Sequence, residues 1–249
     1  MPIQVEDWTT LAFILAGALV GGFINGLTGF GTALAGLPLW LQAVEPLIAA
    51  QLASASSVVG HATNLPHVWK ATDWRRLAPM LLGGLVGVPI GTWLLPMIPL
   101  APFKMTVGIV LILYCSFMLF LAGRVTMPTG GRMAEAVVGF AGGILGGIAA
   151  LSGVLPTIYA SLQGWPKDVR RLFFQAFNSA ILSAMLLASV VQALVGLKFL
   201  AALLVAIPGT IIGAHLGFLA YRRLDDRRFD RLVLFILLLS GVALVWASR

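Results

Sequence analysis

The stretch INGLTGFGTALAGLPLW, from Ile24 to Trp40, interrupts an otherwise apolar segment of the chain. It carries four glycines, and Pro38 lies close to its end. Each interior glycine costs a helix about 1 kcal/mol relative to alanine, and an interior proline costs about 3 kcal/mol. In lipid, a broken backbone persists only where protein covers it or where it lines a cavity. The sequence therefore predicts two half-helices that meet inside a membrane, rather than one continuous helix.

A second copy of this stretch, GFAGGILGGIAALSGVLPTIY, runs from Gly139 to Tyr159. Interrupted apolar segments at matching places in two halves of a chain indicate a transporter binding site. The two copies align at a separation of 118 residues, which pairs Gly21 with Gly139, Gly29 with Gly147 and Pro38 with Pro156.

The composition is that of a polytopic membrane protein, because 59% of the residues are hydrophobic and 10% are charged. Its pI near 10.3 is attributed to arginine-rich loops at one membrane face, and no nucleic-acid partner is expected. Glu6 and Asp7 stand where a signal peptide has its basic region, so no cleavable signal is expected. Cys115 is the single cysteine, and neither a metal site nor a cofactor is predicted.

The predicted fold is all-α, with two repeats that each contain one interrupted segment and three transmembrane helices. The repeats are residues 1–123 and 133–249, joined by a linker over residues 124–132. The interrupted segments run from Thr9 to Val44 and from Met133 to Gln163. The continuous spans, each about 20 residues long, are predicted at Pro46 to Val68, Leu77 to Met97, Phe103 to Leu121, Leu172 to Val195, Phe199 to Leu219 and Leu232 to Ala247.

Loop charge predicts how the repeats are oriented. Thirteen of the 16 basic residues fall in four loops, which the positive-inside rule places in the cytoplasm. Both termini are then periplasmic or extracellular, and each interrupted segment begins and ends on the same face. The two repeats therefore have opposite orientations. Whether an interrupted segment is re-entrant or crosses fully stays open. The four loops are Trp69 to Arg76, Gly123 to Arg132, Gly164 to Arg171 and Tyr221 to Arg231.

The spans carry no carboxylate at mid-depth, because all nine acidic residues lie at span ends or in loops. A membrane site for a cation usually needs such a carboxylate. An anion needs none, since the free N–H groups and the positive dipole at a helix N-terminus can hold it. Half-helix starts are predicted near Gly29 to Thr32 and near Gly147 to Ser152, facing each other. The sequence thus favours a small oxyanion as substrate.

The glycine-rich runs that end in proline, Gly26 to Pro38 and Gly142 to Pro156, together with the size and the duplication, resemble the TauE/SafE group of sulfite exporters. This group is part of a family of four-transmembrane-unit permeases. The resemblance implies secondary export of sulfite or an organosulfonate across a bacterial inner membrane, and the inverted repeat favours alternating access. A passive anion channel is the alternative. A weaker one is an intramembrane serine protease, suggested by Ser152 and His215.

The candidate substrate-binding residues are the polar and glycine residues at the two breaks and on the helices that follow them. The alternative is a purely structural role, in which they cap half-helices or form interhelical hydrogen bonds. His61 is a candidate for proton coupling, or else a packing histidine. The spacing of glycines along several spans is also compatible with a homodimer interface. The substrate-binding candidates are Asn25, Thr28, Gly29, Gly31, Thr32, Gln51, Ser54, Ser57, Gly147, Ser152, Gly153, Gln175, Asn178 and Ser179.

Overall fold

The computed structural model describes residues 8–62, 74–121, 130–165, 167–221, 226–246 and 248. These residues form helices joined by short turns, with no strand among them. Most of the predicted linker and parts of the predicted basic loops lie outside this range. The helices are α1 (Trp8–Thr28), α2 (Thr32–Trp40), α3 (Pro46–Ala62), α5 (Trp74–Leu94), the 3-10 helix η1 (Leu95–Met97), α6 (Leu100–Phe120), α7 (Arg132–Ala149), α8 (Val154–Leu162), α9 (Lys167–Val191), α10 (Leu197–Tyr221) and α11 (Asp226–Trp246).

The predicted all-α membrane architecture is confirmed. Within the described ranges, six helices are long and apolar enough to cross a membrane. They are α1, α6, α7, the apolar parts of α9 and α10, and the stretch of α5 and η1 from Leu77 to Met97. Exposed apolar side chains such as Leu113, Leu204 and Leu187 cover the outside of these helices. A surface of this kind matches lipid rather than water.

The first interrupted segment is a helical hairpin. Helix α1 ends at Thr28, and the left-handed φ angles of Gly29 (80°) and Gly31 (93°) reverse the chain before α2 begins. Helix α2 then runs back along α1, where the indole Nε1 of Trp40 donates a hydrogen bond to the Ile14 carbonyl at 3.0 Å. A Cβ atom on Gly17 would come within 2.5 Å of that indole. A glycine in α1 therefore makes room for the returning half-helix.

The second interrupted segment folds back in the same way. Helix α7 ends at Ala149, Ala150 takes a left-handed φ of 56°, and α8 begins at Val154. Helix α8 returns along α7, so that a Cβ on Gly142 would lie 3.3 Å from the Pro156 ring. The half-helix therefore starts after the predicted range of Gly147 to Ser152. Gly147 is still helical because it packs against α5, where its added Cβ would be 2.5 Å from the Val88 carbonyl oxygen.

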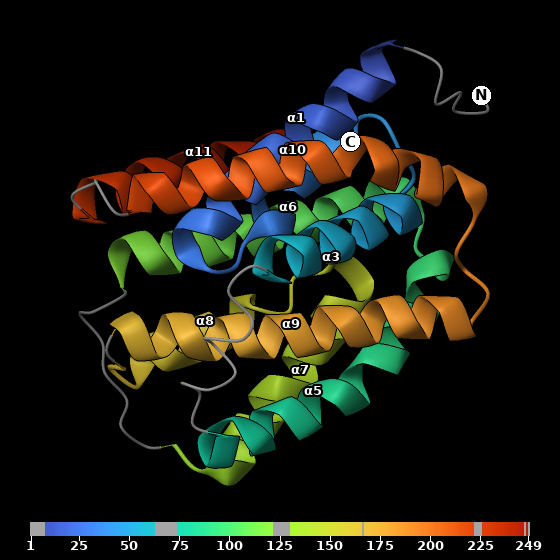
Figure 1. The fold of residues 1–249 in the computed structure, drawn as a ribbon. Helices are drawn as coiled ribbons and strands as arrows, with labels where there is room; N and C mark the ends of the chain where they lie inside the picture. The colour runs from blue at the N-terminus through green and yellow to red at the C-terminus, as the bar shows by residue number, and fades with distance from the viewer. Residues whose placement is uncertain are drawn as a thin grey trace.

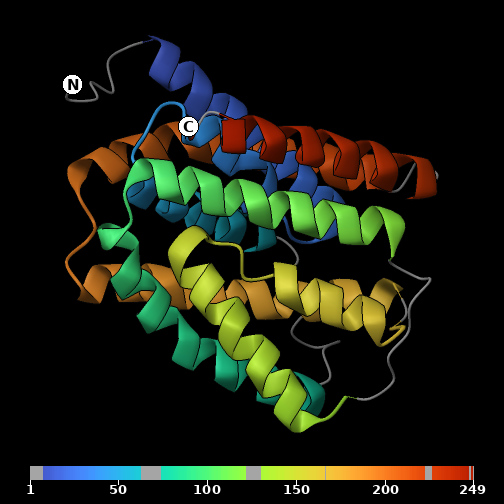
Figure 2. The ribbon, with the colours of Figure 1, turned by 180° about the vertical axis from the view of Figure 1, so that it is seen from behind.

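Each half of the chain contributes one helix that packs against the first helix of the other half. Helix α5 packs along α7, and α10 packs along α1, each pair in parallel (Figure 1). Figure 2 shows the same two pairs on opposite sides of the molecule, seen from behind. Glycines allow the close approach: an added Cβ on Gly143 would overlap the Gly84 carbonyl oxygen, and one on Gly22 would lie 2.6 Å from the Thr210 carbonyl oxygen. Small residues are the usual means by which membrane helices pack this closely.

These contacts correct the alignment of the two copies. Gly22 and Gly143 occupy the same place in their helix pairs, and so do Gly83 and Gly209, which approach α7 and α1 respectively. The separation in the first helix of each half is therefore 121 residues, from Gly22 to Gly143, and not 118. The two prolines are not equivalent: Pro38 lies in the second half of α2, whereas Pro156 lies in the first turn of α8.

Helices α3 and α9 cross between the two outer pairs. The Ser54 hydroxyl donates to Met185 Sδ at 3.1 Å, and the Ser179 hydroxyl lies 3.0 Å from His61 Nδ1. The contacts run in opposite directions along the two helices, so α3 and α9 are antiparallel. Helices α6 and α11 pack against each other on the side seen in Figure 2, where an added Cβ on Gly108 would be 2.7 Å from the Gly241 carbonyl oxygen. The two breaks meet beside the α3–α9 crossing.

Candidate functional site

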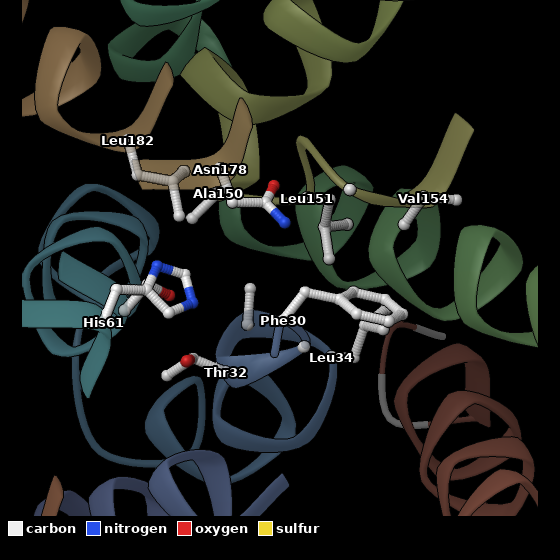
Figure 3. Close-up of a pocket in the computed structure, with 13 residues that line it drawn as sticks. Phe30, Thr32, Leu34, His61, Ala150, Leu151, Val154, Asn178 and Leu182 are labelled. Atoms are coloured by element: carbon white, nitrogen blue, oxygen red, sulfur yellow. The ribbon is translucent and has the colours of Figure 1, made fainter. Parts of the chain in front are cut away.

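A small pocket lies where the two breaks meet the α3–α9 crossing (Figure 3). Both halves of the chain contribute to its lining. The first half supplies the start of α2 and the last turns of α3, and the second half supplies the turn before α8 and the middle of α9. The lining residues are Phe30, Gly31, Thr32, Ala33, Leu34, Ser57, His61, Ala150, Leu151, Gly153, Val154, Asn178 and Leu182.

The N-termini of two half-helices, α2 and α8, border this pocket. Their N-cap residues are Gly31 and Gly153, and neither helix start has a side-chain cap. The first N–H groups of a helix have no partner within the helix, and the positive end of the helix dipole lies there. The Thr32 hydroxyl is fully buried and has no hydrogen-bond partner in the structure. The pocket therefore offers the Thr32 hydroxyl as an unpaired donor to a ligand, whereas at the start of α8 the Val154 N–H donates to the Leu151 carbonyl at 3.3 Å.

The pocket lining contains no acidic, lysine or arginine side chain. His61 is its single titratable residue, and Asn178 and the hydroxyls of Thr32 and Ser57 are its other polar side chains. Figure 3 shows His61, Thr32 and Asn178 arranged around one space. Helix N-termini without a nearby carboxylate stabilise a small anion and disfavour a cation.

His61 joins three elements through hydrogen bonds. Its Nε2 lies 2.7 Å from Asn25 Oδ1 and 3.0 Å from the Gly29 carbonyl oxygen, both in or just after α1. A carbonyl can only accept, so Nε2 carries a hydrogen and Asn25 presents its oxygen. On the other side of the ring, Nδ1 lies 3.0 Å from the Ser179 hydroxyl in α9. The cluster of His61, Asn25, Gly29 and Ser179 thus connects the first break to both crossing helices.

A second polar pair lies beside the pocket. The Ser152 hydroxyl donates a hydrogen bond of 2.5 Å to Asn178 Oδ1, and both side chains are buried. The Asn178 amide lies close over Gly153, where an added Cβ would be 2.9 Å from Nδ2. A glycine at position 153 therefore allows the amide to lie beside the start of α8. This bond also holds the amide oxygen, which leaves the Nδ2 hydrogens as the donors of the Asn178 side chain.

Several predicted site residues lie away from the pocket lining. Gln51 donates from Nε2 to the Leu194 carbonyl at 3.2 Å, beside the turn between α9 and α10. Ser54 donates to Met185, and Gly147 packs against α5. The Thr28 hydroxyl donates to the Ile24 carbonyl at 2.8 Å, as a threonine near a helix end commonly does. Gln175 is also outside the lining, although its backbone carbonyl accepts from Ser179 at 2.6 Å.

The structure brings together Gly31, Thr32, Ser57, Gly153 and Asn178 in the lining, with Asn25, Gly29, Ser152 and Ser179 directly behind it. Apolar lining residues were missed by sequence reasoning, Phe30 and Leu182 among them. Phe30 packs edge-on against Phe174 with ring centroids 5.6 Å apart. Its place between two glycines of the break is the signal that could have identified it. Leu182 carries no such signal, because it looks like any other core leucine of α9.

The serine and histidine that suggested a protease lie on different elements. Ser152 lies in the turn between α7 and α8 and donates to Asn178. His215 is exposed on α10, which packs against α1. The geometry therefore gives no support to a Ser152–His215 dyad.

A family model described as Sulfite exporter TauE/SafE matches residues 13–244, which is nearly the whole chain and includes both breaks. No curated protein and no solved structure matches the chain.

Proposed function

The chain belongs to the sulfite exporter TauE/SafE family, and from that premise we propose that it exports a small sulfur oxyanion, sulfite or an organosulfonate, as a secondary transporter. The family implies a membrane transporter of sulfur anions. The proposal adds a site: the anion binds in the pocket between the starts of α2 and α8. It also adds a mechanism, alternating access, and a location, the bacterial inner membrane.

One observation carries the choice of site. The starts of two uncapped half-helices, one from each half of the chain, border a single pocket that has no carboxylate in its lining. Two positive dipole ends act on the same small volume, and the buried Thr32 hydroxyl has no other partner. A sulfur oxyanion has several acceptor oxygens on a compact group, so it can accept from the Thr32 hydroxyl at the start of α2 while the positive dipole end of α8 faces it.

The exchanged helix pairs support alternating access. Each interrupted segment packs against helices of its own half and, on its other face, against one helix of the other half. A binding site at the interface between two repeats can open to either face when one repeat moves against the other. The left-handed glycines of the first break, Gly29 and Gly31, provide backbone freedom at that interface. The two breaks are then the region of the carrier that changes conformation during transport.

The helix directions support the proposed inverted orientation. Helices α5 and α7 begin at one end of the molecule, with Arg75 and Arg132 in their first turns, whereas α1 and α10 begin at the other end (Figure 1, Figure 2). The end of α11 lies toward the same end as the start of α1. We place the end with Arg75 and Arg132 in the cytoplasm, because basic residues favour that side. Both termini are then periplasmic.

Single-cysteine labelling tests this orientation. In a Cys115→Ala background, we expect an impermeant thiol reagent to label Gly196→Cys in intact cells and to label Gly131→Cys only after the membrane is opened. Both glycines are exposed and have no atom within 4 Å of an added Cβ, so the substitutions should not disturb packing. Rapid labelling at position 131 in intact cells, with none at 196, would show the reverse orientation.

Equilibrium binding to the purified protein tests the substrate class. We expect sulfite, thiosulfate or sulfoacetate to bind, and we expect inorganic cations and neutral solutes of similar size not to bind. Saturation of anion flux in proteoliposomes, and uphill movement of the anion driven by a second gradient, would separate a carrier from a passive channel. Binding of cations alone would overturn the proposed function.

A further inference from the structure

We propose that His61 binds one proton together with the anion, so that the two cross the membrane as a pair. This inference rests on the proposed function, since it assigns the coupling ion of the same transport site. It depends on three observations: the hydrogen bonds around the imidazole ring, the lack of acidic groups around it, and a matched position in the second half of the chain that cannot bind a proton.

The hydrogen-bond partners of His61 can serve both the neutral ring and a ring with hydrogens on both nitrogens. Nε2 is a donor, because it faces the Gly29 carbonyl and the Asn25 amide oxygen. Nδ1 faces the Ser179 hydroxyl, which has a single hydrogen to donate. That hydroxyl lies closer to the Gln175 carbonyl, at 2.6 Å, than to Nδ1, at 3.0 Å. When the Ser179 hydrogen goes to Gln175, the hydroxyl oxygen is left to accept a hydrogen from Nδ1. Both ring hydrogens then have partners.

A buried imidazolium without a counter-charge is costly. His61 is 2% exposed, and the described residues of α1, α2 and α3 carry no other acidic or basic side chain. The hydrogen-bond partners of the ring, Asn25, Gly29 and Ser179, are all uncharged. The acidic, lysine and arginine residues of the other helices occur in the first two turns of those helices. On α9 they are confined to the first turns at Lys167, Asp168, Arg170 and Arg171. On the other helices the charged residues are Arg75 and Arg76 on α5, Lys104 on α6, Arg132 and Glu135 on α7, Lys198 on α10, and Asp226, Arg227, Arg228, Asp230 and Arg231 on α11. Other titratable residues on these helices include Tyr114 and Cys115 on α6, Tyr159 on α8 and the exposed His215 on α10.

The anion itself therefore supplies the missing counter-charge. With the pocket empty, the neutral ring is favoured, and Ser179 shares its hydrogen between two acceptors. When an anion binds at the starts of α2 and α8, the Nδ1 lone pair takes a proton from water on the side to which the pocket is open. The same Nδ1–H bond breaks and returns the proton to water when the anion leaves. One proton thus accompanies each anion, and the net charge that crosses the membrane falls by one unit.

The position in the second half of the chain that corresponds to His61 holds a side chain that cannot bind a proton. Helices α3 and α9 align through Gln51 and Gln175, which pairs His61 with Met185. The contact between Ser54 and Met185 is the counterpart, within one residue, of the contact between Ser179 and His61. Met185 is fully buried and accepts a hydrogen bond through its sulfur. Packing between α3 and α9 does not require a histidine, because a methionine occupies the equivalent position on α9. The histidine at position 61 therefore calls for a functional explanation.

The test measures anion affinity against pH with the purified protein. Thiosulfate and sulfoacetate are suitable probes, because neither changes its charge near neutral pH. For one linked proton, the affinity of the wild type falls by up to about tenfold per pH unit as the pH rises. His61→Gln should bind the anion with an affinity that does not depend on pH. Met185→Leu is the matched control, since it changes the equivalent buried position, and it should keep the wild-type slope. If sulfite is the only ligand, the difference in slope between wild type and His61→Gln is the measured quantity.

Ser179→Ala provides a second variant in case His61→Gln does not fold. It keeps the histidine and removes the acceptor of Nδ1–H, so the pH-dependent region should move about one unit toward acid. A pH-independent affinity in the wild type, or an unchanged slope in His61→Gln, would overturn the role of His61. If the wild type binds none of the three anions at any pH, the proposed function itself fails, and this inference fails with it.

Discussion

Replacement of Asn178 by aspartate will reduce anion affinity by about two orders of magnitude at neutral pH. The substitution is nearly isosteric, and the carboxylate can still accept the hydrogen bond from Ser152. It adds a negative charge to a pocket bordered by two helix N-termini. At about 5 Å and an effective dielectric constant of about 20, two like charges repel by about 3 kcal/mol, which corresponds to a factor of more than one hundred. The measurement is the dissociation constant of the purified variant for the anion that the wild type binds.

A neutral substitution separates charge from the loss of the amide. Asn178→Ala removes the donor hydrogens and leaves Ser152 without its acceptor, which should weaken binding by about ten- to a hundredfold. The aspartate variant should bind more weakly than the alanine variant. An unchanged or increased affinity in Asn178→Asp would mean that the anion does not bind beside Asn178, and the assignment of the site would then be wrong.

Gly143→Ala will cause a large loss of stability, and Gly22→Ala will cause a similar loss. The new Cβ atoms would overlap or closely approach backbone atoms of the facing helix, at Gly84 and at Thr210. Backbone cannot move aside as a flexible side chain can, so the cost should lie at the upper end of the usual range for overpacking, about 3 kcal/mol. For a chain of this size, that cost lowers the melting temperature by about 6 °C or more. Thermal unfolding of the purified variants in detergent measures it.

The control for these variants is Gly196→Ala. Gly196 has nothing within 4 Å of an added Cβ, so its replacement should change the melting temperature by less than about 2 °C. Equal effects at Gly22 and Gly143 are expected because the two glycines occupy the same place in the α1–α10 and α5–α7 pairs. A melting temperature of Gly143→Ala close to that of Gly196→Ala would mean that the α5–α7 pair is not as close as the structure has it.

The sequence by itself determined the class of fold. Apolar spans of about 20 residues can satisfy their backbone in lipid only as helices, so composition and span length were enough to predict an all-α membrane protein. The two breaks were also predictable, because glycine and proline act on the local backbone wherever the chain goes. The start of α2 at Thr32 lies inside the predicted range for that reason.

The tertiary structure decided which residues line the pocket. Gln51 and Gln175 match each other in the repeat, yet neither lies in the lining, because each is displaced along its helix from the residues that reach the pocket. Where two helices meet along their length is fixed by tertiary packing and not by the sequence of either helix. The same holds for the end of α7: its helix continues past Gly147 because that glycine packs on α5. The meeting of His61 with Asn25 and Ser179 requires three helices from both halves of the chain. A pattern along one segment cannot specify such a contact. The contact forms only because α5 packs on α7 and α10 packs on α1, which brings the two breaks together.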